Sequence, residues 1–150
     1  MRIEVTEQVK ATPAAVWALV SDVTRMGEWS PETTKVTWID GASGPVVGAR
    51  FKGTNKRSFA RWSTRCEVIE AEPGAAFSFR VGQGPTTWTY RLAAMGEGCR
   101  VTETAEIPDD SGALVKILLR VMGVKDRPGD LRRGMQATLA RLKVVAEEQA

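Results

Sequence analysis

Short stretches of strand-like sequence follow one another from residue 33 to residue 107, and turn-forming residues separate them. Such a series is typical of an antiparallel sheet, because short hairpins can join only antiparallel neighbours. Alternating apolar and polar residues at the N-terminal end add one strand. One of the separating turns is predicted at Thr54-Asn55. The predicted strands are residues 2–10, 34–39, 49–53, 59–70, 76–81, 87–94 and 99–107.

Two short helices are predicted between the first strand and the rest. Thr12 can cap a helix whose first position is Pro13, where the missing N–H of proline costs nothing. A second short helix is expected over residues 22–26, ended by Gly27.

The pattern becomes helical again after residue 108, with one helix over 113–122 and a longer one over about 130–148. The longer helix carries a single apolar stripe, which needs a concave surface to lie against. The fold class expected is therefore α+β. At 150 residues the chain has the length of one domain, 1–150.

The chain contains no histidine. This excludes Ser-His-Asp and Cys-His catalysis, a histidine general base and histidine metal ligands. Cys66 and Cys99 lack a CxxC spacing, and no histidine activates either thiol, so both are expected in the core. We expect no metal and no cofactor. The charged N-terminus is unlike a signal peptide, and no stretch reaches the ~18 apolar residues of a membrane helix, which predicts a cytoplasmic protein.

The motifs near the N-terminus suggest a family. The run Ala11-Thr12-Pro13-Ala14-Ala15-Val16-Trp17, followed by Asp22 and Glu28-Trp29-Ser30-Pro31, resembles the START/Bet v 1-like (SRPBCC) superfamily in its polyketide cyclase/dehydrase-like branch. Segments 48–51, 68–74, 88–92, 100–103 and 138–143 fit the same pattern. The resemblance implies a helix-grip fold, in which a curved seven-stranded antiparallel sheet wraps around the C-terminal helix and leaves a cavity between them.

The alternation within each strand predicts which side chains face this cavity. In 59–70 the charged set must face water, so Trp62 and Thr64 face inward. Gly134 in the last helix would leave room for a ligand. The alternative is that the inward aromatic side chains fill a solid core. The residues expected to bind a ligand are Phe51, Trp62, Thr64, Phe77, Phe79, Trp88, Tyr90, Met135 and Leu139.

Glu103 is the leading catalytic candidate, because its strand parity places a carboxyl group among apolar neighbours. Tyr90 is its expected partner as a hydrogen-bond donor, unless it is a core tyrosine bonded to backbone. Glu7 shares the inward parity of the first strand and could share a proton with Glu103 or meet a basic partner. The alternatives for these acids are a bulge that turns one outward or a structural pair with an arginine.

Residues 50–65 hold six basic residues and no acid, with Phe51, Phe59 and Trp62 between them. A nucleic-acid surface is one interpretation, but parity turns the aromatic rings inward and the charges outward, so no nucleic acid is expected. Helix 113–122 is rich in Leu and Val. It could be a lid, a transient membrane contact or a helix packed on the rim of the sheet.

The function expected from these observations is the binding of a small hydrophobic molecule, either aromatic, polyketide or lipid-like. The alternative is a polyketide aromatase/cyclase or dehydratase that confines its substrate and assists it with Glu103 and Tyr90. A third possibility, implied by the resemblance, is a partner-binding protein of toxin-antitoxin or co-chaperone type. The chain is expected to be a monomer or a homodimer.

Overall fold

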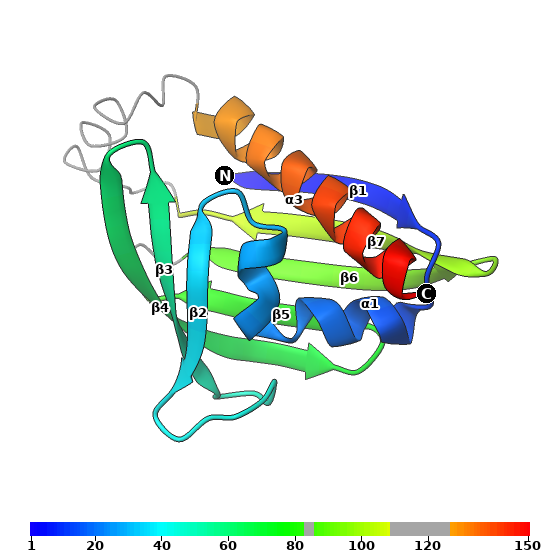
Figure 1. The fold of residues 1–150 in the computed structure, drawn as a ribbon, viewed down its shortest axis with the longest axis horizontal. Coiled ribbons are helices and arrows are strands. Elements are labelled where there is room, and N and C mark those ends of the chain that lie inside the picture. Colours follow the sequence, from blue (N-terminus) through cyan, green and yellow to red (C-terminus); the bar gives the residue numbers. More distant parts are fainter. Residues whose placement is uncertain (83–85, 109–126) are drawn as a thin grey trace.

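The computed structural model describes residues 1–82, 86–108 and 127–150. Its seven strands form one antiparallel sheet in the order β1-β7-β6-β5-β4-β3-β2, which confirms the predicted strand number and pairing (Figure 1). The strands are β1 (Arg2–Val9), β2 (Thr33–Ile39), β3 (Arg50–Arg57), β4 (Ala60–Glu72), β5 (Ala76–Val81), β6 (Thr87–Met95) and β7 (Gly98–Glu106).

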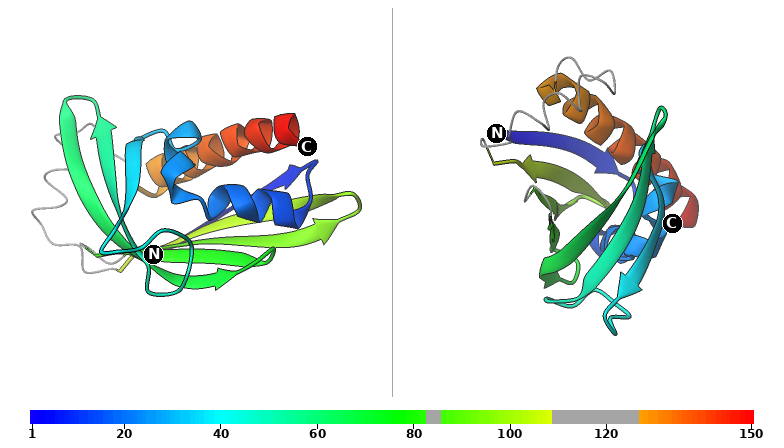
Figure 2. Two further views of the ribbon diagram at one scale, coloured as in Figure 1. Left: turned by 60° about the horizontal axis from the view of Figure 1, so that its bottom comes forward. Right: turned by 90° about the vertical axis from the view of Figure 1, so that its left-hand side faces the viewer.

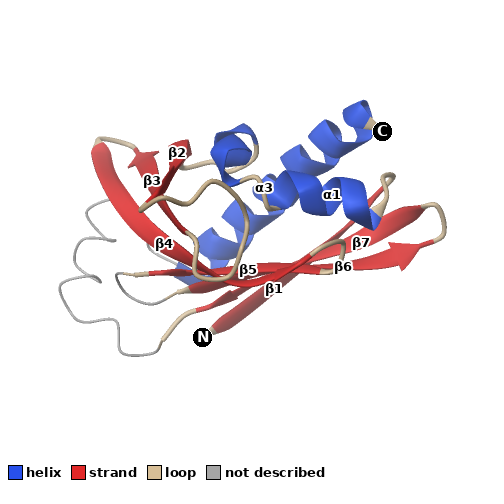
Figure 3. Cartoon of the chain, turned by 90° about the horizontal axis from the view of Figure 1, so that it is seen from below, coloured by secondary structure: helices blue, strands red, loops and turns tan. Residues whose placement is uncertain are grey.

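The helices of the described residues lie on one side of the curved sheet (Figure 3). They are α1 (Pro13–Val20), the short 3-10 helix η1 (Val23–Glu28) and the long α3 (Arg127–Gln149). The hydroxyl of Thr12 accepts a hydrogen bond from Ala15 N at 3.1 Å, so this residue caps α1 as predicted. The helix-grip α+β fold expected from the sequence is confirmed.

The core lies between α3 and the concave face of the sheet, where the apolar stripe of the helix is buried. Leu142 of α3 and Val68 and Val101 of the sheet are fully buried. Helix α1 covers the far end of β5 and β6, and the indole nitrogen of Trp17 donates to the carbonyl of Ala76 at 2.8 Å. This end of the interior is therefore filled by protein side chains.

The predicted turn at Thr54-Asn55 is wrong. Strand β3 continues to Arg57, and the hairpin turns at Ser58-Phe59, where Ser58 takes a positive φ of 54°. Asn55 is a poor strand residue, but its side chain is buried and hydrogen-bonded to neighbouring strands, which offsets that preference. Phe59 lies in this turn and is 74% exposed, so the inward orientation expected for it is also wrong.

The predicted helix 113–122, with its suggested lid or membrane role, lies outside the described residues. In the part of the chain that is described, no helix is both long and apolar enough to cross a membrane.

Candidate ligand-binding cavity

A cavity of about 220 Å³ lies between the first half of α3 and strands β2 to β7. An engineered apolar cavity of roughly 150 Å³ holds benzene, so this space accommodates a molecule of one or two rings. Its apolar wall consists of Met26, Pro31, Val36, Phe51, Trp62, Phe79, Val81, Trp88, Leu131 and Met135. Its polar lining consists of Ser30, Glu32, Thr33, Asn55, Thr64, Tyr90, Glu103, Asp130 and Thr138.

The aromatic wall comes from alternate residues of neighbouring strands. The rings of Phe51 and Phe79 meet edge to face, with centroids 5.2 Å apart. Trp62 and Trp88 are half-buried and face the same space. Strand parity therefore placed these rings correctly, and it did the same for Thr64 and Tyr90. On α3, Met135 also lines the cavity.

Phe77 and Leu139 do not line the cavity, although both were expected to bind a ligand. Both are fully buried in the core. Phe77 lies at the end of β5 that α1 covers, and Leu139 lies about one helical turn beyond Met135. Parity identifies the inward face of an element, but it does not show how far along that face the packing is solid.

Glu103 lies at the deep end of the cavity and is 3% exposed. Tyr90 stands directly opposite it on β6. The inward direction predicted for Glu103 is confirmed. Its Oε1 atom has no hydrogen-bond partner among the described residues. A buried polar atom without a partner costs free energy, and such atoms are rare in folded proteins.

Burial raises the pKa of Glu103 to about 8, although the hydrogen bond with Tyr90 acts in the opposite direction. The pKa of the Tyr90 hydroxyl is raised well above 10, first by burial and then by the adjacent carboxyl. At neutral pH the pair is therefore mostly a neutral carboxylic acid beside a neutral phenol. Because the two groups are hydrogen-bonded to each other, the pair can donate one further hydrogen bond into the apolar space.

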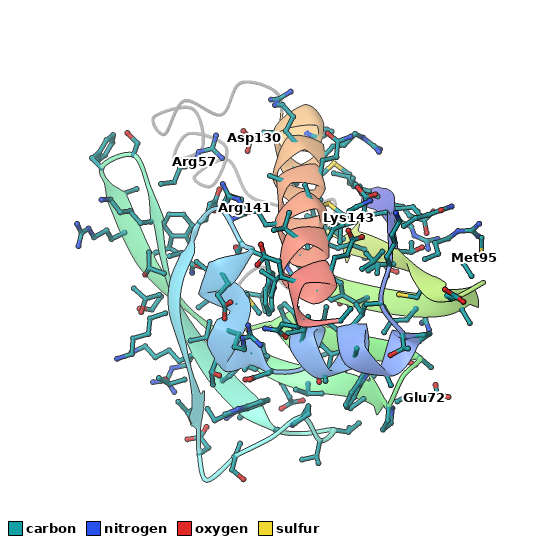
Figure 4. The ribbon with its side chains drawn as sticks, turned by 45° about the vertical axis from the view of Figure 1, so that its right-hand side comes forward. Arg57, Glu72, Met95, Asp130, Arg141 and Lys143 are labelled. Carbon is teal, nitrogen blue, oxygen red and sulfur yellow. The ribbon has the colours of Figure 1, made fainter. Side chains whose placement is uncertain are left out.

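Glu7 does not join this pair. Its register partner on β7 is Val101, whereas Glu103 stands opposite Val5. The Glu7 side chain is 35% exposed, and its Oε1 lies 3.6 Å from Nζ of Lys143 on α3. Figure 4 shows Lys143 on the side of α3 that faces β1. Of the possibilities left open for Glu7, the structure contains the basic partner, which is Lys143.

A chain of polar side chains crosses the wall over β2, β3 and β4. Asn55 accepts from the Thr33 hydroxyl at 3.0 Å, and its amide donates to the Thr64 hydroxyl at 3.2 Å. The sequence prediction missed Asn55 because it was assigned to a turn. Its parity with Phe51 would have revealed it, had the strand been extended to its full length.

Charged groups close the rim of the cavity. The guanidinium of Arg57 donates to both carboxylate oxygens of Asp130, at 2.6 and 2.7 Å, and to Glu32 at 3.1 Å. Figure 4 shows Arg57 and Asp130 facing each other beside the start of α3. Hydrogen bonding to Arg57 lowers the pKa of Asp130. No spacing in the sequence links these residues, so this cluster was not predicted.

Two further residues of the wall behave as the sequence indicated. Burial raises the pKa of the Cys66 thiol to about 11, which makes it a poor nucleophile. Gly134 faces the cavity, and a Cβ atom built there would come no closer than 4.0 Å to Cγ of Pro31. The glycine therefore adds open space to the cavity instead of relieving a clash.

Solved structures of known proteins share this architecture. The polyketide cyclase-like protein Cgl2372 from Corynebacterium glutamicum is 35% identical, with a TM-score of 0.68 over 99% of this chain and 92% of that one. The di-domain aromatase/cyclase StfQ of the steffimycin biosynthetic pathway is 18% identical, with a TM-score of 0.72 over 99% of this chain and 51% of StfQ. Major latex-like protein 151 from Panax ginseng is 13% identical, with a TM-score of 0.73 over 97% of each chain. The latter two show the fold alone.

The sequence has no match among curated proteins. The family described as polyketide cyclase/dehydrase and lipid transport matches residues 1–147, which is nearly the whole chain. Together with the helix-grip sheet and its cavity, this match shows that the chain belongs to the polyketide cyclase/dehydrase and lipid transport family.

Proposed function

We propose that the protein binds a hydrophobic molecule of one or two rings that carries an oxygen atom able to accept a hydrogen bond, such as a carbonyl. The observation that carries the proposal is the unpartnered Oε1 of Glu103, buried at the deep end of an aromatic cavity. A ligand oxygen placed there would satisfy the protonated carboxyl, while Phe51, Phe79 and the two tryptophans would cover the rings.

The family match and the aromatic wall support ligand binding of this kind. The cavity is smaller than the roughly 300–1,000 Å³ of pockets for drug-sized ligands, which favours a small molecule or one that extends past the rim. Pockets of this type are mostly apolar with a few polar groups that fix orientation, and Glu103 and Tyr90 fit that role.

A second candidate function is cyclase or dehydratase catalysis, which the raised pKa of Glu103 favours. In a dehydration, the protonated carboxyl would give its proton to a departing hydroxyl, which leaves as water. The carboxylate would then take the proton released from the neighbouring carbon, so the enzyme returns to its starting state. Tyr90 would hold the carbonyl oxygen on which negative charge develops.

A matched pair of probes tests the binding proposal. 2-Acetylnaphthalene carries a carbonyl, and 2-ethylnaphthalene has nearly the same shape without one. Calorimetry, with the emission of Trp62 and Trp88 as a second signal, should show the ketone binding about fivefold more tightly, which is the value of one hydrogen bond. The preference should disappear above about pH 8 as Glu103 ionises.

Two variants complete the test. Glu103→Gln keeps a donor that does not titrate, so it should retain the ketone preference at every pH. Glu103→Leu should lose it. Equal binding of the two probes to the wild type would contradict the proposal. If a substrate that is turned over is identified, a loss of about 100-fold in turnover by Glu103→Gln with binding intact would favour the catalytic function.

A further inference from the structure

The β3–β4 hairpin has an outer face that is strongly basic. Lys52 stands directly opposite Arg65, and Lys56 stands directly opposite Arg61. All four side chains are exposed, and none of them forms an ion pair with another described residue. Like charges that face each other across two strands are destabilising. The hairpin therefore carries a repulsion that an anionic partner would relieve.

The tip of the same hairpin carries an exposed aromatic ring. Phe59 is 74% exposed, the largest value among the exposed large hydrophobic residues of the described chain. Figure 2 shows the β3–β4 hairpin projecting beyond the body of the sheet and away from the C-terminal half of α3. The structure thus combines one protruding apolar group with four flanking cations.

We propose that this basic hairpin, defined as Lys52, Lys56, Phe59, Arg61 and Arg65, docks onto an anionic lipid surface. Phenylalanine at the tip would enter the boundary between headgroups and acyl chains, and the cations would remain at the level of the phosphates. The proposal does not depend on the ligand of the cavity, since it concerns the outer face of the sheet.

Two other partners fit the hairpin less well. A stable protein interface needs roughly 800 Å² on each side with an apolar centre, whereas the apolar part of this surface is one side chain at its end. Single-stranded nucleic acid binds by stacking on successive aromatic rings. Here Phe51 and Trp62 face the cavity, so Phe59 is the one ring the hairpin offers.

Docking in this way would bring the cavity rim next to the lipid. Arg57 lies two residues before Phe59, and its side chain is bonded to Asp130 on the rim. The inner face of the hairpin would thus line the cavity while its outer face contacts the membrane.

Binding of the ligand-free protein to vesicles tests the proposal. Vesicles of phosphatidylcholine alone are compared with an equimolar mixture of phosphatidylcholine and phosphatidylserine, by co-sedimentation at low salt and at physiological salt. The wild type should bind the anionic vesicles, bind less at higher salt, and leave neutral vesicles unbound. Equal binding to both vesicles, or no binding to either, would overturn the proposal.

Matched variants assign the binding to the hairpin. Each cation near an anionic surface is worth about fivefold in affinity, so Lys56→Glu with Arg61→Glu should weaken binding by at least about 25-fold. Arg100→Glu with Arg141→Glu makes the same change of charge on other exposed positions and should have a much smaller effect. Phe59→Ser should weaken binding about fivefold or more, whereas Val144→Ser, at an exposed site on α3, should not.

Circular dichroism and the melting temperature confirm that each variant is folded. Binding that is insensitive to the hairpin substitutions would overturn the proposal. So would tight binding of a single-stranded oligonucleotide that the same substitutions abolish while vesicle binding is absent.

Discussion

The acid at the deep end of the cavity and the acid at its rim lie in opposite electrostatic surroundings. At the deep end, Glu103 is 3% exposed and has no basic partner among the residues that the structure describes, and burial raises its pKa. At the rim, the Asp130 side chain is 23% exposed and is held by two hydrogen bonds from Arg57, which lower its pKa. The first acid is neutral and retains hydrogen-bonding capacity, whereas the second is ionised and its capacity is already used.

This difference bears on the proposed role of each acid. A carboxylate that an arginine already holds contributes to stability and has little left to offer a ligand. An acid with an unused oxygen lowers stability and is retained where it has another use. The comparison therefore supports the proposed role of Glu103 in ligand binding and a structural role for the Arg57 cluster.

The largest expected effect is the pH dependence that Glu103 gives to folding. Its pKa is about 8 in the folded protein and near 4.5 when unfolded, so the folded state holds a proton that the unfolded state releases. Raising the pH therefore favours unfolding. The free energy of unfolding of the wild type should fall by about 4 kcal/mol relative to Glu103→Gln between about pH 5 and about pH 8.

Urea unfolding at several pH values measures this difference. The Gln variant has no proton to lose at this position and serves as the reference for all other titrating groups. Parallel pH curves for the two proteins would show that Glu103 titrates as a solvated acid.

A smaller loss is expected when the rim cluster is broken. Arg57→Ala leaves Asp130 and Glu32 without their shared cation, and we expect a loss of about 2 kcal/mol, since the cluster is only partly exposed. Arg50→Ala is the matched control on the same strand, because Arg50 pairs with acids while its side chain is 58% exposed. That control should lose less than about 1 kcal/mol.

Chemical unfolding at neutral pH distinguishes the two arginines. Equal losses would show that the rim cluster behaves as an ordinary surface ion pair. The contribution of Asp130 to stability has the opposite pH dependence to that of Glu103. Its lowered pKa contributes stability above the unfolded value of 3.8, and this stability is lost as the pH falls through the folded value.

The polar chain across the wall should contribute less than the rim cluster. Asn55→Ala removes the two hydrogen bonds to Thr33 and Thr64 and should cost about 1.5 kcal/mol. Thr54→Ser, at the exposed neighbouring position, should change stability by less than about 0.5 kcal/mol. Thermal unfolding of both variants tests the contrast. An Asn55→Ala variant as stable as the wild type would show that the two hydrogen bonds of Asn55 do not stabilise the cavity wall.

The smallest expected effect is an increase in stability. Gly134→Ala places a methyl group in open space within α3 and should stabilise the fold by up to about 1 kcal/mol, because alanine favours helix. The same methyl group takes volume from the cavity, so the naphthalene probes should bind less tightly. Gly98→Ala is the opposite control, because its Cβ would collide with the carbonyl oxygen of Val9. A destabilised Gly134→Ala would show that this part of the wall is already full.

The alternation of residues was sufficient to predict the sheet and the direction of most of its side chains. Phe51, Trp62 and Glu103 all face the cavity as parity required. The period of a strand is local, and long β-strands repeat it many times, so the sequence carries that signal well. The resemblance supplied the curvature and the cavity.

The sequence did not predict the long-range contacts between charged residues. Arg57 and Asp130 are 73 positions apart, and their pairing depends on where α3 begins relative to the hairpin. Local turn chemistry also misled the prediction at Asn55, where two side-chain hydrogen bonds hold a turn-forming residue inside a strand. The extent of solid packing around Phe77 depends on α1, which parity within β5 does not report.

The position of the rim cluster also has a consequence for motion. Arg57 fastens the first turns of α3, while the later part of the helix is anchored by fully buried Leu139 and Leu142. The start of the helix can therefore unfold locally at a lower free energy than the whole domain. Its amide hydrogens should exchange with solvent before those around Leu142. Under the proposed function, a ligand entering past Leu131 and Met135 would use this local opening, and its rate of entry would then be set separately from the global stability of the fold.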